Sequence, residues 1–396
     1  MTVADVASTA AVARTVAEFT QDPTRFTGLS GVPDYVARRL PGWAVLGVDV
    51  GILAQTVRAG RICPATPEWV AAFGELGDQQ AEAARRATKR GEADRAKSEF
   101  LAASFWYFVA RWPSPGPGRS DAWDAYARHR AAYLAASRHF DHPFDVVTVP
   151  YEDAEFVGYL HRVPGDSSSA PLAVVCGGID VWKSDLAIHA IAESLVRRGT
   201  NVFAIDIPGT GQSPVRPGAG ALRTFGQLID HLRDRRDVDG RRLGIVGLSF
   251  GGYWATSTGL TDPRVRAVVN IGGPLHYAFQ SDWLEQLSPA TLRSLANSLG
   301  LAPGHHDAMV SSLRDLSLVA CRLLDRPHRP AFLAVNGARD EQVPIADLNL
   351  LTEHDVTQDT LVFGDDRHCA SYSIALHLPF VAAWLAMHLQ EPAPGR

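Results

Sequence analysis

Short, continuously apolar runs alternate with helical stretches from residue 145 onward. Apolar–polar alternation at 145–149 and again at 155–162, across a turn, predicts an antiparallel hairpin. Six further apolar runs predict strands that are buried on both faces: 172–176, 202–205, 243–246, 265–271, 331–335 and 360–363. Helical patterns, such as 185–198 and 222–233, separate most of these runs. The pattern therefore predicts an α/β fold with a mostly parallel central sheet.

The chain before this region is predicted to be helical. Residues 79–111 have a long helical pattern that Gly91 interrupts and that the prolines from Pro113 onward end. The tail of this stretch, 105–108, is apolar on all sides, which predicts burial on more than one face.

A second helix is predicted over 122–140, with Ser120 and Asp121 as its N-terminal cap. The change from helical to strand patterning near Pro143 predicts two domains, a helical one over 1–143 and an α/β one over 144–396.

One stripe of the 122–140 helix carries several large side chains. Packing against a neighbouring layer explains it, and so does a place in the wall of a substrate cavity, with Tyr126 and Tyr133 as candidate substrate contacts. The stripe consists of Tyr126, Arg130, Tyr133, Ser137 and Phe140.

Residues 274–328 contain no clear strand pattern. The segments 281–299 and 306–324 are predicted to be helical. They would form an insertion between two core strands, where a lid over a site could lie.

Composition narrows the class of protein. The 396 residues are 46% apolar and 20% charged, with a formal net charge of −5, as in an ordinary soluble globular protein. The lack of a basic excess argues against a nucleic-acid partner. We find no secretory leader at the N-terminus and no apolar run near the length that crosses a bilayer, so we expect a cytoplasmic protein without a membrane partner.

Four cysteines far apart in sequence are expected to be free thiols without a metal: Cys63, Cys176, Cys321 and Cys369.

The strongest chemical signal is the motif Gly247-Leu248-Ser249-Phe250-Gly251. An apolar strand precedes it and a helical stretch follows it. In this setting the serine occupies a tight strand-to-helix turn that presents its hydroxyl, and glycines flank it because neighbouring backbone leaves no room for side chains. Ser249 is therefore the expected nucleophile.

A serine nucleophile needs a base and an acid that orients the base, and in this architecture both follow the serine, acid first. Asp340 lies just past the predicted strand 331–335, where sites on open α/β sheets collect. Glu341 and Asp347 are rivals for the role of the acid, although Asp347 could simply cap a helix. His368 follows the next strand and is the expected base.

A glycine pair after the strand 172–176 can present backbone N–H groups to an oxyanion. We expect one donor at Gly178 or Ile179 and a second at Phe250, the residue after the serine. Trp182, in the same loop, is a third candidate substrate contact. The glycine-rich segment 206–213 lacks the Gly-Lys-Ser/Thr ending of a phosphate-binding loop and is expected to be structural.

Together these motifs resemble the α/β-hydrolases, and among them the FrsA-like branch. The resemblance covers about residues 90–390 and rests on the serine motif, Asp340, His368 and three further segments. These segments are Ala110-Arg111-Trp112-Pro113, Ala125-Tyr126 with the helix to Phe140, and Gly177-Gly178-Ile179-Asp180-Val181-Trp182-Lys183.

The resemblance implies an α/β-hydrolase fold, a helical lid formed by the N-terminal domain, a Ser-Asp-His triad without a cofactor, and in many members a homodimer. It also implies hydrolysis of a carbon–carbon bond beside a carbonyl, a retro-Claisen step, in an aromatic or polyketide-like small molecule of secondary metabolism. Other members resemble carboxylesterases, so an ester or thioester remains an alternative substrate. A non-catalytic binding or regulatory protein on the same fold is the alternative from another class.

Overall fold

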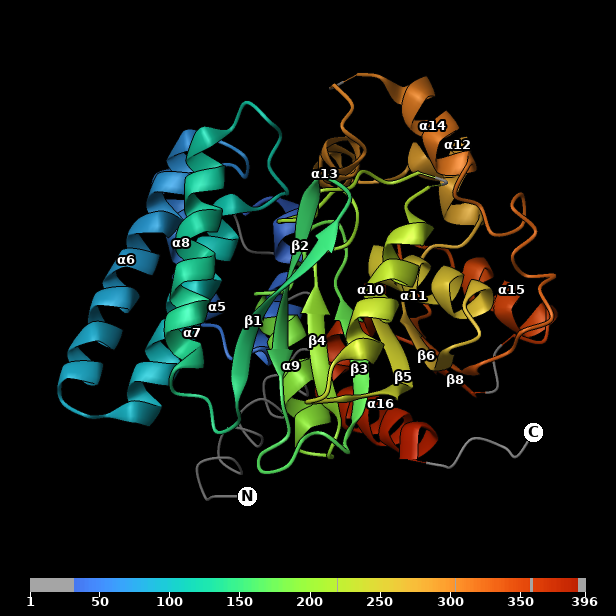
Figure 1. Ribbon diagram of the computed structural model, residues 1–396. Helices are drawn as coiled ribbons and strands as arrows, with labels where there is room; N and C mark the ends of the chain where they lie inside the picture. The colour runs from blue at the N-terminus through green and yellow to red at the C-terminus, as the bar shows by residue number, and fades with distance from the viewer. Residues whose placement is uncertain (1–31, 219, 303, 357–358, 391–396) are drawn as a thin grey trace. The chain divides into compact units, whose positions relative to one another are not determined.

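The computed structural model describes residues 32–218, 220–302, 304–356 and 359–390 (Figure 1). The described residues fall into two compact units, 32–139 with 371–377 and 140–370 with 378–390. This division lies close to the predicted boundary at residue 143. The short segment 371–377 joins the helical unit, which the sequence pattern did not predict. The N-terminal part of the expected helical domain, residues 1–31, lies outside the described residues.

The second unit is built on one eight-stranded sheet. Its order is β1-β2-β4-β3-β5-β6-β7-β8, with antiparallel pairing from β1 to β4 and parallel pairing in the rest. Each strand coincides with a predicted one, so the predicted mostly parallel sheet is confirmed. The strands are β1 (Phe144–Tyr151), β2 (Ala154–His161), β3 (Pro171–Cys176), β4 (Asn201–Ile205), β5 (Asp239–Leu248), β6 (Val265–Ile271), β7 (Ala331–Gly337) and β8 (Asp359–Phe363).

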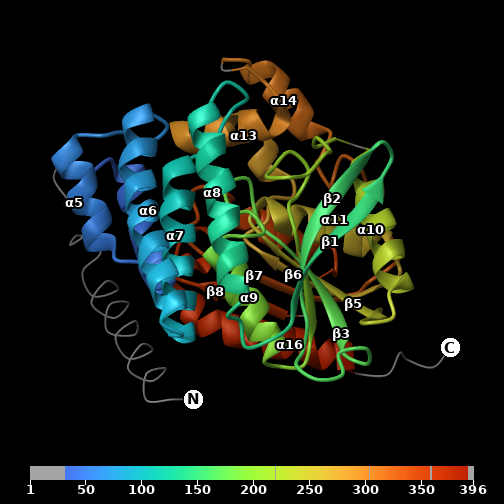
Figure 2. The same cartoon turned by 60° about the vertical axis from the view of Figure 1, so that its left-hand side comes forward.

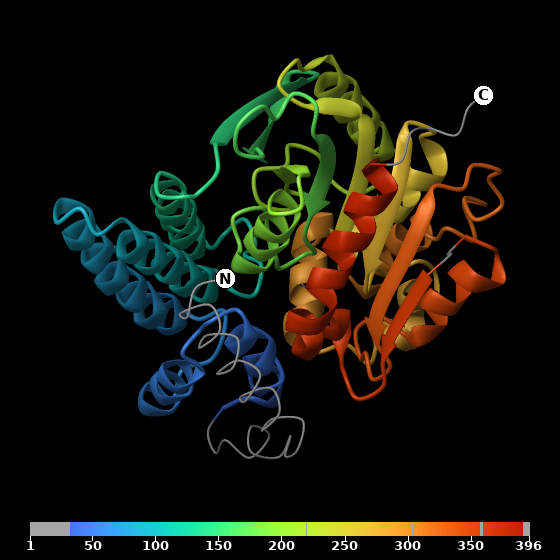
Figure 3. The ribbon, with the colours of Figure 1, turned by 90° about the horizontal axis from the view of Figure 1, so that it is seen from below.

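Helices cover both faces of this sheet. Helices α9 and α16 lie on one face, and α10, α11 and α15 lie on the other (Figure 3). Central strand residues such as Val174, Ile245 and Val268 are therefore completely buried, which explains why these strands are apolar without alternation. The five helices are α9 (Leu186–Val196), α10 (Leu222–Asp234), α11 (Phe250–Thr261), α15 (Ile345–Glu353) and α16 (Ile374–Gln390).

The insertion between β6 and β7 is helical, but it is more broken than predicted. The expected helix 281–299 is two helices, α12 (Ser281–Leu284) and α13 (Pro289–Leu299). The reason is local: the Ser288 hydroxyl accepts the Thr291 N–H at 3.2 Å, and Pro289 occupies the first turn, so a new helix begins there. The following helix, α14 (His306–Arg314), ends ten residues before the predicted position 324.

The first unit contains six described helices, of which α6, α7 and α8 are the longest (Figure 2). The apolar tail of α7 is buried on all sides, as predicted, because Phe105 and Phe108 contact Trp43 while Trp106 stacks on Phe73. The helices are α3 (Asp34–Ala37), α4 (Leu40–Val45), α5 (Val50–Gly60), α6 (Pro67–Lys89), α7 (Ala93–Arg111) and α8 (Ser120–Ser137).

The predicted cap of α8 is wrong. The helix already includes Ser120, its N-cap residue is Arg119, and no side chain caps it. Asp121 instead forms an ion pair with Arg119, with 2.8 Å between Oδ2 and Nη2. An acidic residue in the first turn favours the helix through its dipole, so the sequence pattern located the helix start but not its contacts.

One apolar segment is longer than the sequence analysis allowed. Residues His368–Gln390, which include α16, are long and apolar enough to cross a membrane by length and composition. Half of an 18-residue apolar stretch within this segment is buried inside the fold. Burial of this kind is expected of a core helix. In agreement with it, a Cβ at Gly244 on β5 would lie 2.9 Å from Leu385 and 3.2 Å from Leu389.

Close packing at Gly158 gives a first prediction. A Cβ at this position on β2 would lie 2.1 Å from the ring of Phe203, which is completely buried on β4. Gly158→Ala should therefore lower the free energy of unfolding by about 1–3 kcal/mol in urea titrations. In the background of Phe203→Leu, which frees space, the same substitution should cost clearly less; strictly additive costs would contradict the contact.

Candidate active site

Ser249 occupies a strained turn between β5 and α11. Its backbone angles are φ 55° and ψ −128°, a conformation that a non-glycine residue adopts only when its surroundings enforce it. Ser249 N–H donates to the Ile271 carbonyl at 2.8 Å. A Cβ at Gly247 would lie 2.0 Å from the Gly251 carbonyl oxygen, and one at Gly251 would lie 2.4 Å from that of Gly177. The two flanking glycines are thus required by backbone approach, as the motif predicts.

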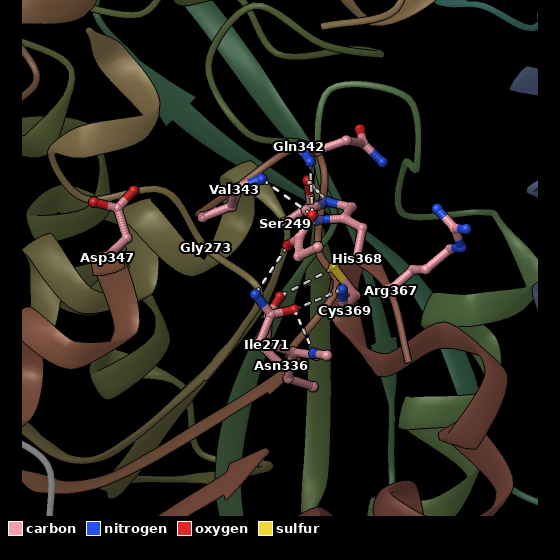
Figure 4. A network of polar contacts seen from close by, with 12 residues as sticks. Ser249, Ile271, Gly273, Asn336, Gln342, Val343, Asp347, Arg367, His368 and Cys369 are labelled. Carbon is pink, nitrogen blue, oxygen red and sulfur yellow. Dashed lines mark hydrogen bonds and ion pairs between the residues drawn. The ribbon is translucent and has the colours of Figure 1, made fainter. Parts of the chain in front are cut away.

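The serine, histidine and aspartate that the sequence singled out lie in one hydrogen-bonded chain, of which Figure 4 labels Ser249 and His368. His368 Nε2 is 2.8 Å from Ser249 Oγ, and His368 Nδ1 is 2.8 Å from Asp340 Oδ2. A carboxylate only accepts hydrogen bonds, so Nδ1 carries the proton and Nε2 is left to accept the serine hydroxyl. This tautomer is the one in which imidazole can act as a base toward Ser249.

The environment of His368 favours its protonated form. Burial lowers the pKa of His368, but the charge and hydrogen bond of Asp340, together with the neighbouring Cys369, outweigh burial and hold this pKa well above its ordinary value. The Asp340 side chain is fully buried, whereas that of His368 keeps 13% exposure. Hydrogen bonds from the backbone N–H groups of Gln342 and Val343, at 2.7 and 3.1 Å, compensate the loss of water around Asp340.

The two rival acids have other partners. Glu341 forms an ion pair with Arg367, the residue before His368. Asp347 is completely buried, and its carboxylate accepts the N–H groups of residues 275–278 at 2.7–3.1 Å. Burial raises the pKa of Asp347, and these four bonds oppose the shift. In Figure 4 Asp347 lies apart from the Ser249–His368 pair. Asp347 therefore stabilises the start of the helical insertion.

The expected oxyanion donors lie beside the nucleophile. A Cβ at Gly178 would lie 2.7 Å from Ser249 Cβ and 3.0 Å from its Oγ, so the Gly178 backbone runs directly past the serine. Phe250 is the first residue of α11, where a backbone N–H has no partner within the helix. Ile179 is buried, and its carbonyl accepts the Trp182 indole N–H at 3.0 Å.

A buried ion pair fixes the loop that carries Gly178. Lys183 Nζ lies 2.5 Å from Asp206 Oδ2, and both side chains are almost fully buried. Asp206 also accepts the backbone N–H groups of Lys183 and Gln212, both at 2.8 Å. The segment 206–213 therefore has a defined structural task, which is to anchor the loop after β3. Breaking such a pair from one side typically costs about 3–5 kcal/mol.

The three aromatic candidates for substrate contact are all buried. Trp182 is 1% exposed and closes its own loop through Ile179. Tyr126 and Tyr133 lie on α8 in the helical unit, where Arg130 stands over the Tyr126 ring at 5.0 Å. Contact with a substrate stays a prediction for all three.

Sequence reasoning missed two polar contacts near the triad. Asn336, at the end of β7, donates to Asp340 at 2.9 Å. Ser294, on α13 of the insertion, donates to Asp180 in the loop after β3. An asparagine at the end of a buried strand was a usable signal for the first contact; nothing in the sequence pairs Ser294 with Asp180. Among the described residues no group of three or more His, Cys, Asp or Glu side chains is arranged to hold a metal ion.

Comparison with known proteins places the chain in a family. A family model described as "Esterase FrsA-like" matches residues 64–386. Relatives named Esterase FrsA are 25% identical over 271 residues in Photobacterium profundum and 26% identical over 290 residues in Yersinia pestis. These alignments cover 65% and 72% of this chain, and 63% and 68% of the relatives.

Solved structures agree on the fold. The 2,6-dihydroxy-pseudo-oxynicotine hydrolase superposes with a TM-score of 0.75 at 18% identity, over 88% of this chain and 95% of the other. AbyA5 superposes with a TM-score of 0.68 at 21% identity, over 89% and 98%. With the strand order and the serine turn described above, the family match means that this chain belongs to the FrsA-like esterase family and has the α/β-hydrolase fold.

Proposed function

We propose that this protein is a cofactor-free serine hydrolase that cleaves an acyl bond of a small molecule. The observation that carries the proposal is the chain from Ser249 through His368 to Asp340, with 2.8 Å at each link. The strained turn at Ser249 and the adjacent Gly178 backbone support it. A binding protein on the same fold would have no need of this arrangement, which argues against the non-catalytic alternative.

In the first step His368 Nε2 takes the proton of Ser249 as Oγ attacks the substrate carbonyl. Asp340 stabilises the imidazolium that results. The carbonyl oxygen becomes an oxyanion, for which the N–H groups of Phe250 and of Gly178 or Ile179 are the proposed donors. These donors are preorganised by α11 and by the Lys183–Asp206 pair.

In the second step the tetrahedral adduct collapses and His368 returns the proton to the leaving group. For an ester the leaving group departs as an alcohol; for a β-dicarbonyl compound the carbon–carbon bond breaks and the enolate carbon is protonated. Either path leaves an acyl group on Ser249, which water removes with His368 again acting as base. The same residues thus serve both reactions, and the leaving group decides between them.

Two finer assignments follow. The esterase name of the family and of its relatives supports hydrolysis of an ester or thioester. The resemblance in sequence to carbon–carbon hydrolases, together with the fold shared with the 2,6-dihydroxy-pseudo-oxynicotine hydrolase, supports retro-Claisen cleavage of an aromatic or polyketide-like ketone. The lid role of residues 1–143, the homodimer and the cytoplasmic location stay predictions.

A substrate comparison separates the two reactions. Rates on a p-nitrophenyl ester and on an aryl β-diketone should both fall to background in Ser249→Ala, a loss of about 10⁴–10⁶ in kcat. Labelling by a fluorophosphonate should also disappear in Ser249→Ala. The control variant Ser312→Ala, at a serine on α14 away from the triad, should still be labelled. Turnover of the diketone by the wild type would favour carbon–carbon cleavage; an active and labelled Ser249→Ala would refute the proposal.

The choice of acid can be tested with matched carboxylates. Asp340→Asn should lower kcat by about 10⁴, because an amide no longer holds the imidazole in its active tautomer. Asp347→Asn should instead lower the free energy of unfolding, with turnover retained, because its carboxylate serves backbone N–H groups of the insertion. Kinetics and urea unfolding on both variants decide the matter, and the reverse pattern would transfer the role to Asp347.

The pH dependence follows from His368. Catalysis needs its neutral form. The pKa of His368 lies well above the ordinary value because Asp340, together with Cys369, outweighs the effect of burial. We therefore expect kcat/KM to rise with pH through a midpoint above about 6.5. Residual activity of Asp340→Asn should have its midpoint at lower pH, since the negative charge that raises the pKa is gone. A wild-type midpoint below about 6 would contradict this electrostatic picture.

A further inference from the structure

Asn336 connects the two loops that carry the acid and the base. It is the next-to-last residue of β7, is 1% exposed, and pairs in register with Val362 of β8. Its Nδ2 donates to Asp340 Oδ2 at 2.9 Å. Its Oδ1 accepts two backbone N–H groups, from Gly337 and from Cys369, each at 2.9 Å. One side chain thus contacts the acid and Cys369, the residue that follows the base; Figure 4 labels Asn336 and Cys369.

These partners determine which chemistry fits the position. Two backbone donors require an acceptor on one side, and a carboxylate requires a donor on the other. The primary amide of asparagine satisfies both at once without a charge. An ionised carboxylate at this position would face Asp340 without a proton to donate. An aliphatic group would remove the acceptor of two backbone N–H groups and one of the four hydrogen bonds that Asp340 accepts.

The backbone that Asn336 holds is strained. Directly after His368, Cys369 has φ 61° and Ala370 has φ 46°, two consecutive left-handed residues that are not glycine. The contact to the Cys369 N–H therefore supports the turn that aims His368 at Ser249. A Cβ at Gly337 would lie 2.2 Å from the Arg367 carbonyl oxygen, so the acid and base loops approach through their backbones at the same place.

We propose that Asn336 is a positioning residue of the triad, which fixes the geometry of His368 through Cys369 and shares with His368 the oxygen of Asp340 that faces it. Oδ2 of Asp340 receives both His368 Nδ1 and Asn336 Nδ2. The amide N–H stabilises the ionised carboxylate, so it moderates the pull of Asp340 on the imidazole proton. This inference rests on the proposed function, because it assigns Asn336 a part in the same triad.

Other titratable groups surround this pair. The Cys369 thiol donates to the Ile271 carbonyl at 3.2 Å, and Glu341 and Arg367 form an ion pair next to His368. Asp366 accepts the Arg367 N–H at 2.7 Å. A substitution at Asn336 leaves the chemical identity of these groups unchanged, and a control at another buried asparagine separates its effect from that of an added buried charge.

The informative variant is Asn336→Asp. It keeps an acceptor for both backbone N–H groups but puts a second carboxyl against Asp340. At the 2.9 Å of the present contact between Asn336 and Asp340, two carboxyls share one proton at neutral pH and lose it at higher pH. The shared proton takes the place of the amide N–H. We expect the rate of fluorophosphonate labelling to approach that of the wild type near pH 6 and to fall behind by at least about tenfold as the shared proton leaves. The added charge also raises the pKa of His368.

Two further variants give the limits. Asn336→Leu removes all three bonds and should slow labelling by about tenfold to a hundredfold at every pH. The matched control is Asn270→Asp, at a buried asparagine on the adjacent strand β6 that bonds Gly273 N–H at 2.6 Å and Thr256 Oγ1 at 2.9 Å. Its labelling profile should keep the wild-type shape. Circular dichroism on each variant checks that the fold is retained.

A second measurement does not depend on catalysis. The low-field NMR signal of the His368 Nδ1 proton, identified by its loss in His368→Gln, reports the titration of His368. Asn336→Asp should shift this titration to higher pH, and Asn270→Asp should not. If the wild type resists labelling, the proposed function fails while this shift still supports the role of Asn336. Identical titrations in wild type and Asn336→Asp, or equal shifts in both aspartate variants, would overturn it.

Discussion

The tight backbone turn at Ser249 is the constraint on which the site depends. With φ at 55°, the turn brings α11 against the ends of β3 and β5, so closely that Gly247 and Gly251 leave no room for a Cβ. Such strain persists only when a rigid surrounding enforces it. The completely buried strands of the parallel sheet supply that surrounding, and the same turn leaves the first N–H of α11 beside the hydroxyl it presents.

Two buried carboxylates, Asp340 and Asp347, show that the identity of the hydrogen-bond donors, and not burial, separates a catalytic role from a structural one. Asp340 and Asp347 follow the same strand, and each accepts four hydrogen bonds. All four donors to Asp347 are backbone N–H groups, so this carboxylate stabilises the loop 275–278. One donor to Asp340 is the imidazole of His368, the only one of the eight whose group can take up and release a proton, through its other ring nitrogen, during catalysis. This contact with His368 gives Asp340 a part in proton transfer, which Asp347 lacks.

This contrast explains what the sequence could and could not predict. The strands, the serine turn and the order of acid and base follow from short local patterns. These are the apolar runs, the glycine-flanked serine motif, and the polar residues that come directly after a strand. The choice of Asp340 over Asp347 depends on where two loops lie in space; its place just past a strand favoured Asp340, but sequence spacing could not exclude Asp347. The same limit applies to Asn336, whose partners lie up to 33 residues away. The broken helix at 285–288 and the contacts of Asp121 were missed for a different reason, because single side chains there decide where a helix begins.

The helical insertion is coupled to the chemistry within the catalytic unit itself. Its helix α13 donates from Ser294 to Asp180, in the loop that runs past Ser249 through Gly178. The next segment of that loop is fixed by Lys183 on Asp206, and a Cβ at Gly209 would lie 2.2 Å from the Ser298 carbonyl of α13. The loop after β3, the segment 206–213 and α13 therefore form one contact network around buried charges. Because displacing one partner of a buried charged contact is costly, the positions of α13 and of the loop that carries the proposed oxyanion donor Gly178 depend on each other.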